Sequence, residues 1–268
     1  MTGAHAAAAD DASSAPATVA PSPERWRVRG RLLALDRPLV MGILNVTPDS
    51  FSDGGLYVDE RAALARAERL VEEGADLLDV GGESTRPGAA AVAAAEERAR
   101  AVPLIRRLYE RLGNAVPISV DTRKAEVARA ALEAGAAIVN DISALGDPEM
   151  ADVVRSAGAG VVLMHMRGTP ETMQALARYG DVVGEVSAEL DTAYRAALAR
   201  GIAAEQIVLD PGIGFAKTGE HNLALLASLD ALAARLDRPL LLGPSRKAFL
   251  GELLGGVPPE ERAVGTAA

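Results

Sequence analysis

The chain contains no cysteine, only one tryptophan, and fewer basic than acidic side chains. Without cysteine it can form neither a disulfide framework nor a cysteine-ligated zinc or iron–sulfur site, and it has no thiol nucleophile. With 28 basic and 37 acidic residues its net charge is −9, which disfavours a general nucleic-acid-binding protein. No uncharged apolar run approaches the roughly 20 residues that cross a membrane. We expect a soluble, cytoplasmic protein with no nucleic-acid and no membrane partner.

The first 23 residues differ in composition from the rest of the chain. They are mostly Ala, Ser, Pro and Thr, and Asp10 and Asp11 interrupt the alanines. A secretory signal would instead place a basic segment before an apolar one. We therefore expect residues 1–23 to be a disordered tail and residues 24–268 to form a single domain, for which the chain is long enough.

Short apolar runs rich in Val, Ile and Leu alternate with longer amphipathic stretches from Leu39 onward. Seven runs are candidate strands: 39–46, 75–80, 116–120, 136–140, 160–164, 206–209 and 239–243. Four of the clearest helical patterns are 61–73, 95–112, 124–134 and 179–200. Apolar strands separated by helices are typical of a parallel sheet covered by helices. Gly74, Gly135 and Gly158 each precede a strand, where we expect them to end helices in the left-handed conformation.

Polar residues follow almost every predicted strand. They are Asn45, Asp79 with Glu83, Asp121, Asn140 with Asp141, His165, Asp210, and Ser245 to Lys247. The first strand is followed by neither the dinucleotide-binding glycine motif nor a phosphate-binding Walker loop. In a (β/α)8 barrel all strand ends converge on one face, whereas an open sheet gathers only those near one crevice. The sequence therefore predicts an α/β protein with a barrel of this kind.

Three of these side chains could bind one ligand together. Asp121, Asn140 and Asp210 would place two carboxylates and an amide in an apolar barrel mouth, which is costly unless they are paired. A heterocycle with adjacent N–H donors would satisfy them. For Asp210 alone, followed by Pro211 and Gly212, a simple strand-to-turn signal is the more common interpretation.

Two segments are suited to anions. Arg86 is flanked by hydroxyls and glycines, and its guanidinium could bind phosphate oxygens in pairs, although an isolated arginine is more often a surface residue. Ser245 to Lys247 precede a helical pattern, where backbone N–H groups attract carboxylate or phosphate, unless Ser245 only caps the helix. His165 has no second histidine nearby, so we interpret it as a packed, hydrogen-bonded residue rather than a metal ligand.

Taken together, these segments resemble the dihydropteroate synthase family of folate biosynthesis, a family of (β/α)8 barrels. The resemblance extends from about Leu39 to Ala268. It is carried by 42–54 (GILNVTPDSFSDG), 79–88 (DVGGESTRPG), 119–122 (SVDT), 140–141 (ND), 164–166 (MHM), 210–215 (DPGIGF) and 245–247 (SRK). Several long motifs in the family's order make chance similarity very improbable.

The resemblance implies a Mg²⁺-dependent transferase that condenses (7,8-dihydropterin-6-yl)methyl diphosphate with 4-aminobenzoate to give 7,8-dihydropteroate and diphosphate. It implies catalytic roles for Asp121, Arg86 and Lys247. It implies a pterin site of Asp121, Asn140, Met164, Asp210, Gly243 and Lys247. It implies contacts to diphosphate or 4-aminobenzoate from Phe51, Asp53, Thr85, Arg86, Pro87, Phe215 and Ser245. Asn45 would bind the Mg²⁺ that accompanies the diphosphate.

The chain departs from the family pattern at its carboxyl end. Members continue beyond Ala268 through an eighth strand with an Arg-x-His motif and a last helix, and helices there form a homodimer interface. We therefore expect a barrel domain that lacks strand 8 and helix 8, and a homodimer in the full-length form. Two alternatives to the synthase remain at this point. One is a non-catalytic or truncated pterin-binding paralogue, and the other is a pterin domain of the methyltetrahydrofolate:corrinoid methyltransferase type.

Overall fold

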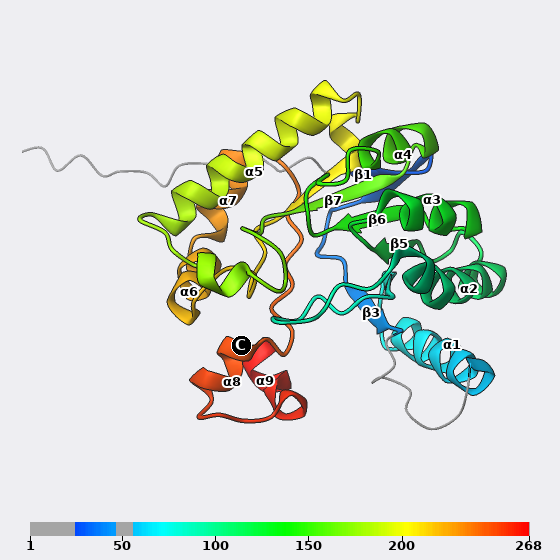
Figure 1. Cartoon of the computed structure of the whole chain (residues 1–268), viewed down its shortest axis with the longest axis horizontal. Coiled ribbons are helices and arrows are strands. Elements are labelled where there is room, and N and C mark those ends of the chain that lie inside the picture. Colours follow the sequence, from blue (N-terminus) through cyan, green and yellow to red (C-terminus); the bar gives the residue numbers. More distant parts are fainter. Residues whose placement is uncertain (1–24, 47–55, 268) are drawn as a thin grey trace, which may run out of the picture.

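A parallel six-stranded sheet forms the centre of the structure, a computed structural model that describes residues 25–46 and 56–267 (Figure 1). Its strands are β3 (Met41–Asn45), β4 (Leu77–Gly81), β5 (Ile118–Asp121), β6 (Ile138–Asp141), β7 (Gly160–Met164) and β8 (Ile207–Asp210). Each strand pairs in parallel with the next one along the chain. The first six predicted strands are therefore confirmed, with ends shifted by one or two residues.

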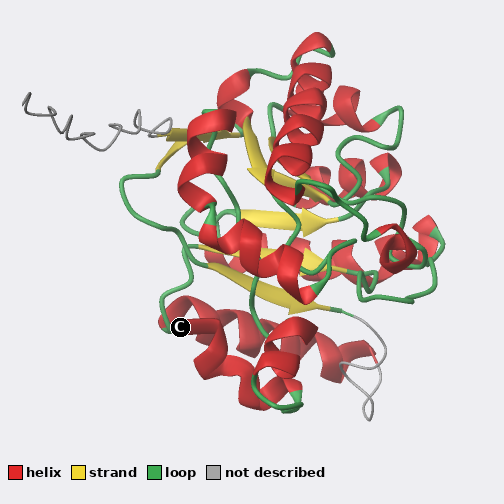
Figure 2. Cartoon of the chain, turned by 90° about the vertical axis from the view of Figure 1, so that its left-hand side faces the viewer, coloured by secondary structure: helices red, strands yellow, loops and turns green. Residues whose placement is uncertain are grey.

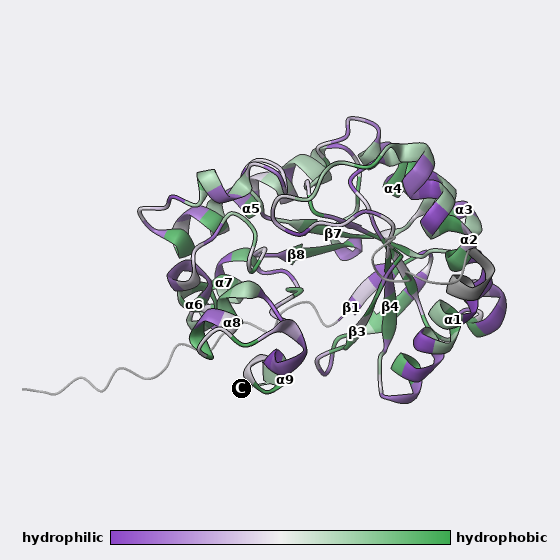
Figure 3. Cartoon of the chain, turned by 60° about the horizontal axis from the view of Figure 1, so that its bottom comes forward, coloured by the Kyte–Doolittle hydropathy of each residue, from purple (hydrophilic) through white to green (hydrophobic). Residues whose placement is uncertain are grey.

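Helices alternate with the strands and cover the outer face of the sheet (Figure 2). They are α1 (Leu56–Glu72), α2 (Ala94–Leu112), α3 (Ala125–Ala134), α4 (Met150–Ala157), α5 (Val182–Ala199), α6 (Gly219–Ala227), α7 (Leu229–Leu236), α8 (Ala248–Leu253) and α9 (Ala263–Ala267). Helix α2 shows why they pack there, because Leu104, Ile105 and Leu108 recur at helical spacing and are buried. Figure 3 shows β4, β7 and β8 as mainly hydrophobic, whereas helices such as α1 and α4 carry both hydrophobic and hydrophilic residues. Within the described residues, none of the helices is long and apolar enough to span a membrane.

The glycines that precede the strands adopt positive φ angles, as expected. Gly158 ends α4 in the left-handed helical conformation with φ of 60°, whereas Gly74 and Gly135 have φ of 107° and 121°. Gly135 is required for two reasons. Its φ angle is one that side chains rarely allow, and a Cβ atom there would lie 2.4 Å from Cγ of Tyr109. The glycines therefore allow both the turn and the close approach of α2.

An amino-terminal hairpin that the sequence did not predict lies under the sheet. Strands β1 (Arg25–Val28) and β2 (Arg31–Ala34) pair antiparallel. Trp26 is 4% exposed and its indole nitrogen donates to the carbonyl of Gln206 over 2.8 Å. Trp26 and Val28 pack against inward-facing residues of four strands, which are Leu77, Ile138, Val162 and Val208. The hairpin therefore fills the amino-terminal end of the barrel, away from the strand ends that carry the polar residues.

The seventh predicted strand, 239–243, forms only an isolated parallel bridge from Leu240 to Leu209 of β8. The amide of Leu209 donates to Pro239 over 3.0 Å, and the amide of Leu241 donates to Leu209 over 2.8 Å. Pro239 has no N–H to extend this ladder in one direction, and Pro211, which directly follows β8, has none to extend it in the other, which explains why a full strand does not form. On the opposite side, no strand among the described residues pairs with the outer edge of β3, where Ile43 is 51% exposed. Eight strands are described in all, counting the hairpin.

We expect Trp26→Ala to lower the free energy of unfolding by about 3–5 kcal/mol, because it leaves a cavity in the base of the barrel. Trp26→Phe keeps most of the packing and loses only the hydrogen bond to Gln206, so it should cost much less. Urea unfolding followed by far-ultraviolet circular dichroism measures both variants. Equal stability of the two variants would contradict the packing role of the hairpin.

Candidate functional site

The strand ends place three of the predicted site residues in one row across the sheet, with Gly81 between the first two. Asn45 of β3 is in register with Gly81 of β4, Gly81 with Asp121 of β5, and Asp121 with Asn140 of β6. Gly81 leaves room between its neighbours, since Asn45 Oδ1 and Asp121 Oδ2 lie 3.4 and 3.5 Å from the position a Cβ atom would take there. The sheet register therefore brings amide and carboxylate oxygens together at the carboxyl-terminal face, as predicted.

Three buried or partly buried aspartates give this face an unusual electrostatic character. Burial raises the pKa of Asp210 to about 6, against the hydrogen bond that the Gly212 amide donates to its carboxylate over 2.7 Å. The pKa of Asp121 is raised well above its usual range, first by burial and then by the negative charges of Asp79 and its other acidic neighbours. Burial also raises the pKa of Asp79, which accepts a hydrogen bond from Asn140 Nδ2 over 3.0 Å. Such shifts are typical of ligand-binding or catalytic sites.

Lys247 supplies a positive charge to these acids. Its ammonium lies 4.1 Å from the centre of the Phe215 ring, and burial lowers its pKa while Asp210 and Asp121 oppose this. The loop after β8 packs on the lysine stem, because a Cβ atom on Gly214 would lie 3.0 Å from Lys247 Cδ. Lys247, from the segment 245–247, is thus brought together with Asp210 and Phe215 of the segment 210–215.

The helix that follows Lys247 differs from the expectation. Helix α8 begins at Ala248 with Lys247 at its N-cap, and no side chain caps it. Ser245 is exposed and precedes Arg246, which has a positive φ of 55°. Ser245 therefore does not act as the helix cap that the sequence left open as an alternative.

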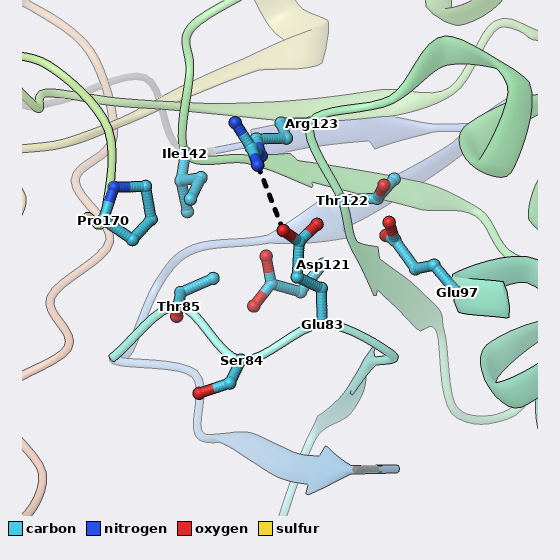
Figure 4. A pocket seen from close by; sticks show the side chains of 9 residues that line it. All are labelled: Glu83, Ser84, Thr85, Glu97, Asp121, Thr122, Arg123, Ile142 and Pro170. Atoms are coloured by element: carbon cyan, nitrogen blue, oxygen red, sulfur yellow. Dashed lines mark hydrogen bonds and ion pairs between the residues drawn. The ribbon is translucent and has the colours of Figure 1, made fainter. Parts of the chain in front are cut away.

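The loop between β4 and α2 lines a pocket beside Asp121. Figure 4 shows the lining side chains, which are Glu83, Ser84, Thr85, Glu97, Asp121, Thr122, Arg123, Ile142 and Pro170. Thr85 is half-buried in this lining, whereas Arg86 and Pro87 are exposed beside it. The loop is held to the segment after β7, because the amide of Gly88 donates to the carbonyl of Pro170 over 3.0 Å. The predicted anion-binding loop thus borders the acidic row.

A buried ion cluster supports this loop from below. Glu83 accepts hydrogen bonds from Arg123 over 3.0 Å and from Lys124, and Lys124 also pairs with Glu97 of α2. Burial alone would raise the pKa of Glu83, but the bonds from Lys124 and Arg123 lower it. Burial raises the pKa of Glu97 despite its contact with Lys124. Gly82 allows this packing, because a Cβ atom there would lie 2.8 Å from the backbone oxygen of Glu97.

The remaining predicted site residues have different outcomes. Met164 is buried beside Phe215, and a Cβ atom on Gly243 would meet no atom within 4 Å. Phe51 and Asp53 lie outside the described residues. The sequence singled out His165 only as a packed residue and did not point to Lys217, whose ammonium nitrogen lies 3.0 Å from His165 Nδ1. Only its position seven residues after Asp210 could have drawn attention to it.

The donor set fits Mg²⁺ in part. Within residues 25–46 and 56–267, no group of three or more His, Asp or Glu side chains could hold a metal ion alone. Asn45 and Asp121 nevertheless direct two oxygen atoms to the space beside Gly81. Mg²⁺ prefers oxygen ligands and is commonly held by one or two protein groups together with substrate phosphates and water. The site therefore suits a metal ion that arrives with a phosphorylated ligand.

We expect Lys124→Met to lower the free energy of unfolding by about 3–5 kcal/mol at pH 8, the usual cost of removing one partner of a buried ion pair. The loss should be smaller at pH 5. Lys124 opposes the effect of burial on the pKa of Glu97, so without Lys124 this pKa is raised further. As pH falls the variant takes up a proton on Glu97 and avoids the cost of a buried, unpaired charge, which it carries at pH 8. Urea unfolding at the two pH values measures this difference.

Arg111→Met is the matched control, because Arg111 pairs with Glu68 at the surface. Its effect should stay within about 1 kcal/mol and change little with pH. A loss in Lys124→Met that is the same at both pH values would contradict the role assigned to Glu97.

Comparison with known proteins agrees with this geometry. Residues 41–268 match the family model of pterin-binding enzymes. A dihydropteroate synthase of Synechocystis is 51% identical over 237 residues, which are 87% of this chain and 80% of the relative. The unmatched part of that relative is thus a fifth of its length.

Solved structures of high sequence identity share the fold. A Xanthomonas albilineans dihydropteroate synthase with 4-aminobenzoic acid superposes with a TM-score of 0.84 and 50% identity, covering 92% of this chain and 86% of that one. A structure of the enzyme from the same organism in complex with 7,8-dihydropteroate gives a TM-score of 0.80 and 46% identity, covering 90% of this chain and 86% of that one. The α/β fold is therefore of the TIM-barrel family, as expected, and the chain belongs to the pterin-binding enzymes and, among them, to the dihydropteroate synthase family.

Proposed function

We propose that this chain is a transferase that joins (7,8-dihydropterin-6-yl)methyl diphosphate to 4-aminobenzoate, forming 7,8-dihydropteroate and diphosphate. The observation that carries the proposal is the row of Asn45, Asp121 and Asn140 in register, with Asp210 and Lys247 beside it. It offers hydrogen-bond acceptors and a cation around one space. The similar Xanthomonas albilineans structures contain 4-aminobenzoic acid and 7,8-dihydropteroate, which are a substrate and the product of this reaction.

The pterin ring would lie against the strand ends. A pterin presents an amino group and adjacent ring N–H donors along one edge, and the carboxylates of Asp121 and Asp210 with the amide of Asn140 can accept from them. Asp79 accepts from Asn140 Nδ2, so the Asn140 oxygen stays free to accept from the ligand. Lys247 would donate to the ring, and Met164 and Gly243 would line its flat faces.

The diphosphate would lie at the β4–α2 loop. Arg86 and Thr85 offer a guanidinium and a hydroxyl there, and the guanidinium can bind two phosphate oxygens at once. Asn45 would hold Mg²⁺ through its side-chain oxygen. When bound, Mg²⁺ would neutralise charge on the leaving diphosphate. Phe51, Asp53, Pro87, Phe215 and Ser245 would form the 4-aminobenzoate pocket, with Ser245 near its carboxylate.

The reaction breaks the bond between the pterin methylene carbon and the diphosphate oxygen, and the electron pair leaves with the diphosphate. The lone pair of the neutral arylamine then attacks that carbon, and the resulting ammonium releases a proton. An arylamine is already nucleophilic, so the site needs no strong general base. Asp121 would instead offset the positive charge that develops on the pterin, while Arg86 stabilises the departing anion.

Three coarser expectations accompany this activity. Residues 24–268 would act as one catalytic domain, with 1–23 as a tail. The full-length protein would form a homodimer, as the family resemblance implies. Its small, charged substrates are consistent with action in the cytoplasm.

Incubation of the chain with both substrates and Mg²⁺ should yield 7,8-dihydropteroate and diphosphate, measured by chromatography. Lys247→Ala should lower kcat/KM by about a hundredfold, the usual cost of removing one charge-stabilising group from an active site. Its circular dichroism spectrum should be unchanged, because Lys247 lies at the rim of the site. Pterin binding without any product would overturn the synthase activity and favour a binding paralogue.

We expect pterin binding to weaken as pH falls below about 6, because the pKa of Asp210 is raised to about 6 and protonation removes its charge and turns one acceptor oxygen into an O–H donor. Calorimetric titration with a pterin between pH 5 and pH 8 measures this. Asp210→Asn should bind more weakly at pH 8 and lose the part of the pH dependence that Asp210 sets. A flat profile in the unmodified chain would contradict the assignment.

A further inference from the structure

A buried lysine behind the Phe215 loop has no role in the mechanism above. Lys217 is 4% exposed, and its ammonium donates to the carbonyl of Phe215 over 2.9 Å. The same nitrogen lies 3.0 Å from His165 Nδ1, and His165 Nε2 lies 2.9 Å from a carboxylate oxygen of Glu189 on α5. A continuous chain of contacts thus runs from α5 through the end of β7 to the loop after β8.

The protons of this chain follow from its donors. An ammonium group can only donate, so His165 Nδ1 accepts from Lys217 and Nε2 carries the proton that is directed to Glu189. Burial, followed by the charge of Lys217, lowers the pKa of His165 to about 4, which keeps the ring neutral. His165 therefore acts as a fixed connector between Lys217 and Glu189.

The loop that Lys217 holds is conformationally demanding. Gly212 and Gly214 have φ of 69° and 82°, and Ala216 has φ of 49° although it carries a side chain. A Cβ atom on Gly212 would lie 2.0 Å from the carbonyl oxygen of His165, so the loop lies directly on the end of β7. A non-glycine residue in the left-handed region is unfavourable without support from its surroundings. The bond from Lys217 to Phe215 O supplies such support between Gly214 and Ala216.

The surroundings of Lys217 contain charges of both signs. Glu189 and Asp210 favour its charged form, whereas Arg167 and Lys247 oppose it, and Tyr179 faces His165 from a ring centroid 6.2 Å away. Burial outweighs the acids and lowers the pKa of Lys217 to about 7. An apolar side chain would fill the same space without this cost. Burying an ammonium group is energetically costly, and this cost indicates that the hydrogen bonds of Lys217 hold the loop in position.

We propose that Lys217 is a positioning residue that fixes the Phe215 carbonyl and thereby sets the Phe215 ring against the Lys247 ammonium for substrate binding. The proposal rests on the synthase activity proposed above, because Phe215 and Lys247 are the groups that would contact the aryl and pterin substrates. Lys217 itself contacts neither the reacting atoms nor the metal. It acts through the loop, with His165 and Glu189 holding its ammonium in place.

The first test is Lys217→Met, which keeps an unbranched side chain, one atom shorter, and removes both donated bonds. We expect KM for 4-aminobenzoate and for the pterin diphosphate to rise, with a combined loss in kcat/KM of about a hundredfold, because small misplacements of binding groups cost this much. Arg29→Met is the matched control. Arg29 also donates two bonds to backbone carbonyls, those of Leu132 and Ala136, but at the opposite end of the barrel. If both variants lose stability equally and only Lys217→Met raises KM, positioning is supported.

Chemical rescue separates the ammonium from the space it fills. The chain has no cysteine, so Lys217→Cys carries a single thiol. Alkylation in urea with 2-bromoethylamine, followed by refolding, restores an ammonium at the length of lysine, whereas 1-bromopropane gives an apolar chain of the same length. We expect the first product to regain low KM values and the second to behave as Lys217→Met. Equal recovery with both reagents would overturn the proposal.

A readout without substrate keeps this test independent of the synthase activity. ¹⁵N spectra of histidine-labelled chain should show a neutral ring with its proton on Nε2 at about pH 6, where Lys217 is charged, assigned to His165 by its loss in His165→Gln. In Lys217→Met that ring should titrate at a higher pH, because a neighbouring positive charge is gone. An unchanged ring would overturn the proposal even in an active enzyme. If the His165 ring titrates at a higher pH in Lys217→Met but the unmodified chain makes no product, the contact between Lys217 and His165 is supported. Only the synthase activity is then rejected.

Discussion

Burial of several carboxylates at the ends of adjacent parallel strands is the constraint on which the rest of the site depends. The register of β3 to β6 places Asn45, Gly81, Asp121 and Asn140 in one row, whatever the loops above them do. Side-chain oxygens that lie close together in a partly buried site repel one another, and they attract N–H donors and cations. Burial makes the charged carboxylates unfavourable, and it is the main reason why the pKa values of Asp121 and Asp210 are raised.

Two ionic groups on either side of the row hold its loops. On the β4–β5 side, Lys124 joins Glu83 to Glu97 and supports the loop that carries Arg86. On the β7–β8 side, Lys217 and His165 hold the loop that carries Phe215. In both groups a lysine, half-buried in the case of Lys124 and buried in the case of Lys217, bonds to groups on separate segments, so the loops are held before any ligand enters. Such preorganisation lowers the entropic cost of binding.

Much of this arrangement could be predicted from the sequence, because local patterns cause it. Apolar runs predicted six strands, and polar residues directly after them marked Asp121, Asn140 and Asp210. What could not be predicted depends on contacts between distant segments. Trp26 enters the base of the barrel through a contact with Gln206, 180 residues away, and Lys217 meets His165 across 52 residues. The segment 239–243 failed as a strand because Pro239 and Pro211 lack the N–H groups that would extend its pairing with β8. The family resemblance, rather than any pattern, indicated a role for Phe215.

The order of strands in the sheet is the same as their order in the chain, from β3 to β8. During synthesis each strand can therefore add to an edge that already exists, and no segment has to wait for a distant partner to begin pairing. The proposed pterin-binding residues are also synthesised in this order. Asp121 and Asn140 leave the ribosome well before Asp210, and Lys247 follows last. Until Lys247 arrives, the nascent chain carries Asp121 and Asp210 without the ammonium that faces them in the folded chain.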